Sequence, residues 1–153
     1  GMEMLKTTRI VFSVLFLFVF VFSDCKLGGG GDDDGDNINW AALYVEINVD
    51  QVYNETIASF GTDFFKFTTG GSGSYQISVT GTSANGDMGW VLVDGPDPFA
   101  ANLLADQDDF DDNSNEIAQV TLAGGTTYYL IVDEWADPGS DVTYTLEVAS
   151  PPS

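Results

Sequence analysis

The chain has 153 residues, a single cysteine, no histidine and a formal net charge of −20 at pH 7. Without histidine, the usual histidine-dependent nucleophilic triads are excluded, and zinc loses one of its preferred ligands. The negative charge disfavours nucleic acids and anionic lipid headgroups as partners, because both require a basic surface.

A short apolar segment near the N-terminus predicts export. Lys6 and Arg9 precede the apolar run Ile10 to Phe22, which is the arrangement of a secretory signal peptide. The run is shorter than the roughly 20 residues that a membrane-spanning helix requires. We therefore expect residues 1–24 to be a signal peptide that is removed from the mature protein.

The junction after the apolar run allows two cleavage sites. Cys25 is followed by a glycine- and aspartate-rich segment, and it resembles the acylated cysteine of a bacterial lipoprotein. Residues 25–38 would then form a flexible acidic tether that holds the protein at the envelope or cell surface. The alternative is cleavage after Ser23, which fits the small-x-small pattern and would release a soluble secreted or periplasmic protein.

Period-two alternation of apolar residues predicts an all-β domain over residues 39–149, with a short tail at 150–153. Apolar and polar side chains alternate from Leu43 to Val49, from Tyr75 to Val79 and from Tyr144 to Val148. Further strands are predicted at Phe64 to Thr68, Trp90 to Asp94, Ile117 to Leu122 and Tyr128 to Asp133. About eight short strands in one domain predict an antiparallel, jelly-roll-like β-sandwich.

An ordered series of segments resembles the bacterial pre-peptidase C-terminal domain, a β-sandwich found beside secreted proteases and in other exported proteins. The series consists of Thr62 to Phe67, Gly73 to Val79, Trp90 to Asp94, Leu122 to Val132 and Tyr144 to Val148. The resemblance covers about Glu46 to Val148 and implies the sandwich fold. Its motifs are core and turn residues, which define architecture rather than chemistry.

The segment from Asp106 to Glu116 has a dense set of acids and is expected to lack strand character. Its carboxylates belong to Asp106, Asp108, Asp109, Asp111, Asp112 and Glu116. Carboxylates held close together repel one another unless a cation relieves them, and oxygen ligands favour calcium. The segment therefore predicts either a weak calcium site or a solvated acidic loop. The segment from Asp32 to Asp36 is a second candidate for a cation-binding site. The alternative is that it serves only as a spacer.

The three tryptophans differ in their surroundings. Trp40 and Trp90 lie in strand-like patterns, which predicts that both pack in the core. Trp135 lies in the turn-rich segment Asp133 to Gly139, where an exposed aromatic ring can contact a sugar or a protein side chain. Packing of Trp135 over the edge of the sheet is the alternative.

These patterns favour a non-catalytic, exported binding or adhesion module on a bacterial lipoprotein, with calcium as a candidate stabilising ion. Its ligand would be a protein or a polysaccharide, contacted around Trp135 and the segment from Asp106 to Glu116. An alternative is a structural accessory domain that aids the export or stability of a partner and has no small ligand. A hydrolase that uses only carboxylates would need two acids facing each other across a pocket. The oligomeric state is not specified by the sequence.

Overall fold

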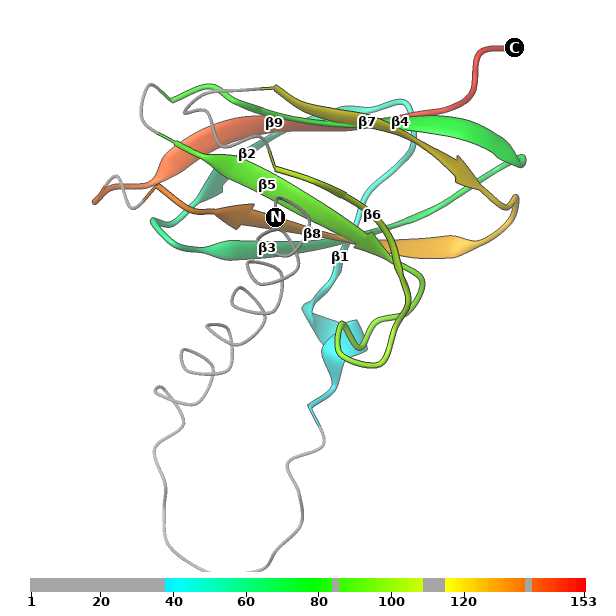
Figure 1. The fold of residues 1–153 in the computed structure, drawn as a ribbon, viewed down its shortest axis with the longest axis horizontal. Coiled ribbons are helices and arrows are strands. Elements are labelled where there is room, and N and C mark those ends of the chain that lie inside the picture. Colours follow the sequence, from blue (N-terminus) through cyan, green and yellow to red (C-terminus); the bar gives the residue numbers. More distant parts are fainter. Residues whose placement is uncertain (1–37, 84–85, 109–114, 137–138) are drawn as a thin grey trace, which may run out of the picture.

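The computed structural model describes residues 38–83, 86–108, 115–136 and 139–153 (Figure 1). The predicted signal peptide, Cys25 and the tether as far as residue 37 lie outside these ranges. Asp109, Asp111 and Asp112 of the predicted calcium site also lie outside them. Within the described ranges, no helix is both long and apolar enough to span a membrane.

Two β-sheets pack face to face and form one sandwich (Figure 1). The first sheet has the strand order β1-β3-β8-β5-β6, and the second has the order β2-β9-β4-β7. The elements are η1 (Trp40–Leu43), β1 (Val45–Glu46), β2 (Val52–Ile57), β3 (Thr62–Thr68), β4 (Gly73–Gly81), β5 (Met88–Val93), β6 (Leu103–Gln107), β7 (Asn115–Leu122), β8 (Thr127–Glu134) and β9 (Val142–Ala149). Neighbouring strands are antiparallel except β1 and β3. The predicted all-β sandwich in a single domain is confirmed.

The main core lies between the two sheets and consists of alternate residues of the strands. The inward side chains of β4 and β9 are buried, as the alternation predicted: Tyr75, Ile77, Val79, Tyr144, Leu146 and Val148. Trp90 of β5 is buried among them, and its indole N–H donates a hydrogen bond of 2.9 Å to the carbonyl oxygen of Glu116 in β7. The predicted core position of Trp90 is confirmed, and its ring joins the two sheets.

The first sheet also buries apolar side chains on its outer face. Tyr44, Val93 and Ile131 form a second cluster there. The ring of Tyr44 lies edge-on to Phe64 and Tyr129, with centroid distances of 5.3 and 4.8 Å. The alternation predicted that each sheet has one face exposed to solvent. This prediction is correct for β4 and β9 but not for this part of the first sheet.

The predicted strand from Leu43 to Val49 is wrong in extent and in facing. Leu43 belongs to η1, and both Leu43 and Val45 are exposed, whereas Tyr44 between them is buried. Ile47 reaches the main core. The chain passes here from the outer face of the first sheet to its inner face, so one alternating face cannot persist. Trp40, also predicted for the core, lies on η1 and is only partly buried.

Two strands, β2 and β6, were not predicted. Both are edge strands of their sheets, with three exposed residues of six in β2 and three of five in β6. Proteins protect the unpaired backbone side of an edge strand with short strands and charged or polar side chains instead of a long apolar alternation. The apolar alternation that identifies a central strand is therefore weak in both segments.

Candidate functional site

Four connections meet at one end of the sandwich, which we call the acidic end. They are the connections β2–β3, β4–β5, β6–β7 and β8–β9. The strand register shows the convergence: the start of β3 at Thr62 pairs with Asp133 near the end of β8, and the start of β5 at Met88 pairs with Glu134. The described acids at this end include Asp63, Asp87, Asp108, Glu116, Asp133, Glu134 and Asp141. Lys66 is the only basic residue after residue 26, so the acidic end carries strong negative charge.

The start of β5 brings Trp135 and Asp108 to this same end. The backbone N–H of Trp135 donates a 2.9 Å hydrogen bond to the carbonyl oxygen of Asp87. Asp108 lies against Gly89, where an added Cβ would stand 3.3 Å from the Cβ of Asp108. The side chain of Trp135 is partly exposed. Two residues that are 27 positions apart in the chain thus flank one strand end.

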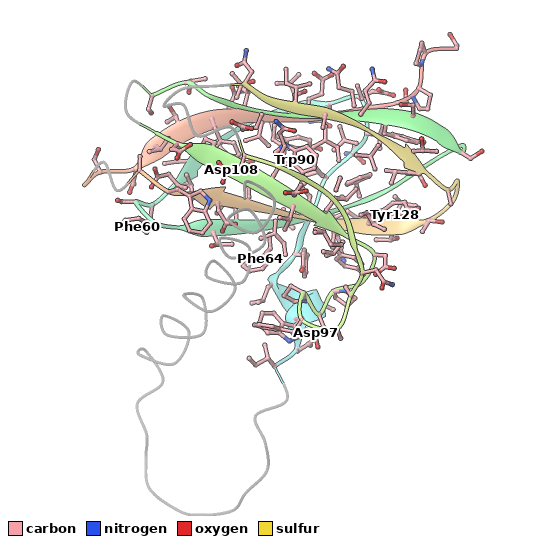
Figure 2. All side chains as sticks on the ribbon, in the orientation of Figure 1. Phe60, Phe64, Trp90, Asp97, Asp108 and Tyr128 are labelled. Carbon is pink, nitrogen blue, oxygen red and sulfur yellow. The ribbon has the colours of Figure 1, made fainter. Side chains whose placement is uncertain are left out.

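Glu134 fixes the shape of the acidic end from inside. Its side chain is only 2% exposed. One carboxylate oxygen accepts a hydrogen bond from the N–H of Phe60 at 2.9 Å, and the other accepts from the N–H of Ala136 at 2.7 Å and of Asp87 at 3.4 Å. A single carboxylate therefore ties three of the four connections together. Figure 2 shows Phe60 and Asp108 at this end of the molecule.

Glu134 was not identified from the sequence, although a signal for it was present. The predicted strand ended at Asp133, and Glu134 was assigned to the turn around Trp135. In β8 the inward residues are Tyr128, Leu130 and Val132, all buried in the main core. Extending this period by two positions places Glu134 on the inward face.

A hydrogen bond also joins the two sheets near this end. The hydroxyl of Tyr144 in β9 donates to the carboxylate of Asp63 in β3 at 2.6 Å. Burial raises the pKa of Asp63, although the hydrogen bond from Tyr144 acts in the opposite direction. Burial and the nearby charge of Asp63 raise the pKa of Glu55 as well. A carboxylate with a raised pKa in the folded state opposes folding when it is ionised, and protonation at lower pH removes that opposition.

The predicted acidic loop is shorter than the sequence indicated. Asp106 lies in β6 and is exposed, whereas Glu116 lies in β7 and is 0% exposed, on the face between the sheets. The expectation that the whole segment lacks strand character was wrong, because two strand ends extend into it. Across the described ranges, no three acidic or cysteine side chains gather closely enough to hold a metal ion.

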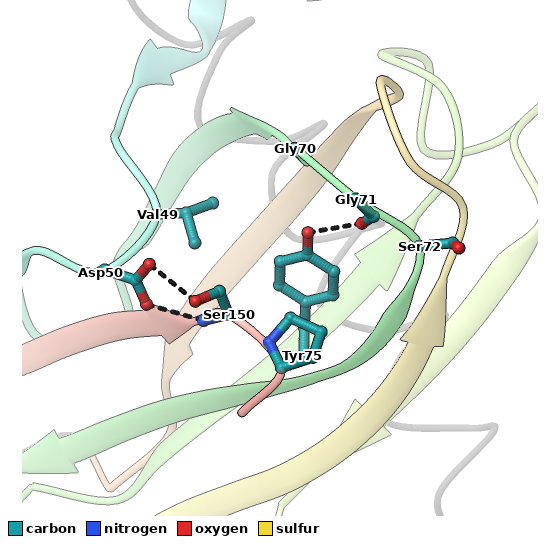
Figure 3. Close-up of a pocket in the computed structure, with 8 residues that line it drawn as sticks. Val49, Asp50, Gly70, Gly71, Ser72, Tyr75 and Ser150 are labelled. Atoms are coloured by element: carbon teal, nitrogen blue, oxygen red, sulfur yellow. Dashed lines mark hydrogen bonds between the residues drawn. The ribbon is translucent and has the colours of Figure 1, made fainter. Parts of the chain in front are cut away.

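A separate open pocket of about 410 Å³ lies at the opposite end of the sandwich (Figure 3). Its lining comes from two turns, from Tyr75 of β4 and from the chain after β9: Val49, Asp50, Gly70, Gly71, Ser72, Tyr75, Ser150 and Pro151. The carboxylate of Asp50 accepts hydrogen bonds from the N–H and the hydroxyl of Ser150, both at 2.7 Å, and these lower its pKa. The pocket has one carboxylate, so it offers no acid pair for glycoside hydrolysis.

No protein-family model matches the sequence, and a search of curated proteins finds no match. Solved structures match the fold. The pre-peptidase C-terminal domain of a collagenase from Bacillus anthracis is 25% identical, with a TM-score of 0.52 over 67% of this chain and 91% of that chain.

Two further solved structures share the fold at lower identity. The surface-associated copper-binding protein CorA of Methylomicrobium album BG8 is 8% identical, with a TM-score of 0.55 over 71% of this chain and 99% of that chain. The Yersinia pseudotuberculosis-derived mitogen is 13% identical, with a TM-score of 0.50 over 67% of this chain and 86% of that chain. The chain therefore has a fold like that of the pre-peptidase C-terminal domain, as its ordered segments predicted.

Proposed function

We propose that the protein is a non-catalytic, exported binding module that contacts a protein or a polysaccharide through its acidic end. The observation that carries this proposal is that Trp135 and Asp108 flank the start of β5. An aromatic ring can stack on a sugar or an apolar side chain, and carboxylates accept hydrogen bonds from hydroxyl or basic groups. Loops held on a rigid β-scaffold are a common location for such sites.

The solved structures support a binding or accessory role and an exported location. A pre-peptidase C-terminal domain belongs to a collagenase, and CorA is described as surface-associated. With the signal-like N-terminus, this supports export across a membrane. We further propose that acylation of Cys25 anchors the mature protein to the envelope or cell surface.

The decisive experiment compares the wild-type protein with Trp135→Ala. We expect the substitution to weaken binding to the ligand about tenfold, because a stacking ring contributes roughly 1–2 kcal/mol. Pull-down on chitin, cellulose, peptidoglycan and collagen, followed by titration on whichever surface retains the wild type, measures the effect. Trp40→Ala is the matched control, since Trp40 is also partly exposed and lies outside the acidic end.

The stability of Trp135→Ala distinguishes the two roles of this residue. A thermal midpoint within about 2 °C of the wild type, with weakened binding, supports the proposal. A large loss of stability would instead make Trp135 a packing residue. Wild-type protein that binds none of these surfaces would count for the accessory role, in which the domain aids a partner and has no small ligand.

We also propose that calcium steadies the β6–β7 connection at the acidic end. Asp106 and Asp108 would supply oxygen ligands together with Asp109, Asp111 and Asp112. Glu116 would join them only if the start of β7 opened, because its side chain is fully buried.

Thermal unfolding tests this role of calcium. In ~10 mM calcium, a site with a Kd of ~1 mM adds about 1.4 kcal/mol and raises the midpoint by roughly 5 °C relative to EDTA. Magnesium and sodium chloride of matched ionic strength are the controls, and Asp108→Asn should reduce the calcium effect. Equal effects of all the salts would show a screened acidic surface without a specific site.

A further inference from the structure

An aromatic tip projects from the outer face of the first sheet. We define the tip as Trp40 and Leu43 of η1 together with Phe99 of the β5–β6 connection. Both segments extend away from the sandwich in Figure 1, and Figure 2 places Asp97 of the same connection at their far side. The rings of Trp40 and Phe99 lie 5.7 Å apart at an angle of 60°. Leu43 is 41% exposed and Phe99 is 53% exposed, so the tip presents apolar surface to its surroundings.

Hydrogen bonds hold the tip in this shape. The hydroxyl of Tyr44 donates to the carbonyl oxygen of Pro96 at 2.9 Å, which links η1 to the β5–β6 connection. The carboxylate of Asp97 accepts from the N–H of Phe99 at 2.9 Å. The carboxylate of Asp94 accepts from the backbone and side-chain N–H groups of Asn102 at 2.7 and 2.8 Å. The aromatic rings are therefore displayed by a braced connection, and little ordering is needed before they bind.

We propose that the tip inserts its aromatic rings into the headgroup region of a zwitterionic lipid bilayer. Tryptophan and phenylalanine rings favour this region, because it accommodates apolar rings beside polar groups. The proposal rests on the proposed anchoring at Cys25. The 13 residues from Cys25 to residue 37 lead into Ile38, directly before η1. Even a fully extended chain of this length spans at most about 45 Å, so the tip stays within that distance of an anchored Cys25.

The position of the tip also suits the proposed ligand site. The β5–β6 connection leaves β5 at Val93, whereas the acidic end lies at the other end of this strand, at Met88. With the tip on the bilayer, the acidic connections lie at the other end of β5 from this contact. The tip thereby provides a second contact with the bilayer, and two separate contacts orient the domain where one flexible attachment would not.

Charge determines which lipids the tip can bind. The protein carries a formal charge of −20, and Asp94 and Asp97 lie in the β5–β6 connection itself. Anionic headgroups therefore repel the domain, and salt screens that repulsion. The proposal predicts binding to phosphatidylcholine vesicles that weakens when phosphatidylglycerol is added and recovers at higher salt. A basic membrane-binding surface would show the opposite dependence.

Vesicle flotation of the chain from residue 25 to residue 153, with Cys25→Ser, tests the tip without any acyl group. We expect measurable binding to phosphatidylcholine vesicles, and Phe99→Ala should reduce the partition coefficient about tenfold because it removes an inserted ring. Phe60→Ala is the matched control, since Phe60 is 47% exposed but lies at the acidic end. Tryptophan quenching by brominated phosphatidylcholine should decrease in Trp40→Phe, which keeps an aromatic ring at this position.

The outcomes separate the tip from the anchor. Three results would each overturn the tip proposal. The first is that the wild type does not bind the vesicles, and the second is that Phe99→Ala and Phe60→Ala lower the partition coefficient equally. The third is that Trp40→Phe leaves the quenching of tryptophan fluorescence unchanged. Palmitate labelling of the full chain and of its Cys25→Ala variant tests the anchor independently. If the full chain is not labelled by palmitate but still binds vesicles, the proposed anchor at Cys25 is wrong and the tip remains as a membrane contact.

Discussion

Replacing Trp90 with alanine is expected to lower the free energy of unfolding by about 5 kcal/mol. Trp90 is among the largest fully buried side chains, and its removal leaves a cavity between the two sheets. It also removes the hydrogen bond to the carbonyl oxygen of Glu116, which joins β5 to β7. A domain of this size has a total stability of only about 5–15 kcal/mol, so the variant should lose between about a third and all of it.

Urea denaturation followed by circular dichroism measures this effect. The control is Trp90→Phe, which keeps an aromatic ring but cannot donate the hydrogen bond. It should cost clearly less than Trp90→Ala, about 2 kcal/mol, because much of the apolar contact remains. If alanine and phenylalanine destabilised the protein equally, the hydrogen bond rather than the packing of the ring would be the main contribution.

Replacing Glu134 with alanine should cost about 3 kcal/mol and loosen the acidic end in particular. The substitution removes the acceptor for the N–H groups of Phe60, Asp87 and Ala136. Buried donors without an acceptor each oppose folding by roughly 1–3 kcal/mol, and solvent can reach some of them once the connections move apart. Removal of one negative charge from a protein with a net charge of −20 acts in the opposite direction.

Hydrogen exchange locates the change. The amides of Phe60 and Ala136 should exchange faster in Glu134→Ala, whereas amides in the centre of β4 should change less. Glu134→Gln is the matched variant, because it keeps one oxygen acceptor and the length of the side chain. Uniform acceleration throughout both sheets would mean that Glu134 supports the whole fold rather than the shape of the acidic end.

The Glu134 variants also connect stability to the proposed function. Trp135 and Ala136 directly follow Glu134, and the N–H of Trp135 binds the same segment, at Asp87, that Glu134 holds. Ligand binding should therefore weaken in Glu134→Ala although Glu134 is buried and contacts no ligand. In this respect Glu134 is a positioning residue, and its effect on binding should be partly rescued in Glu134→Gln.

The fold class was predictable because alternation is a local property of the chain. The inward faces of β4 and β9 were read correctly, since both are central strands whose apolar residues recur at every second position. The order of the turn and core segments also predicted the likeness to the pre-peptidase C-terminal domain. Each of these inferences depends on neighbouring residues, which the sequence displays directly.

The facing of β7 and the course of the chain before β2 could not be read in this way. In β7 a glutamate, Glu116, faces the core while Ile117 is 44% exposed, which is the reverse of what the polarity of the two side chains favours. Near Tyr44 the chain changes from one face of the sheet to the other. Both outcomes depend on where the segment pairs in the sheet and on what covers it, and these are long-range contacts that no local pattern records.

The candidate site shows the same division. Residue type identified the acids and Trp135 as candidates, because carboxylates and exposed aromatic rings have recognisable chemistry in any fold. The pairing of β5 with β8 and β6 then placed Trp135 and Asp108 on the two sides of the start of β5, and it let Glu134 tie the connections from within. The pairing of β7 with β4 enclosed Glu116. Strand register joins residues far apart in the chain, and it is selected by the packing of the whole core rather than by any one segment.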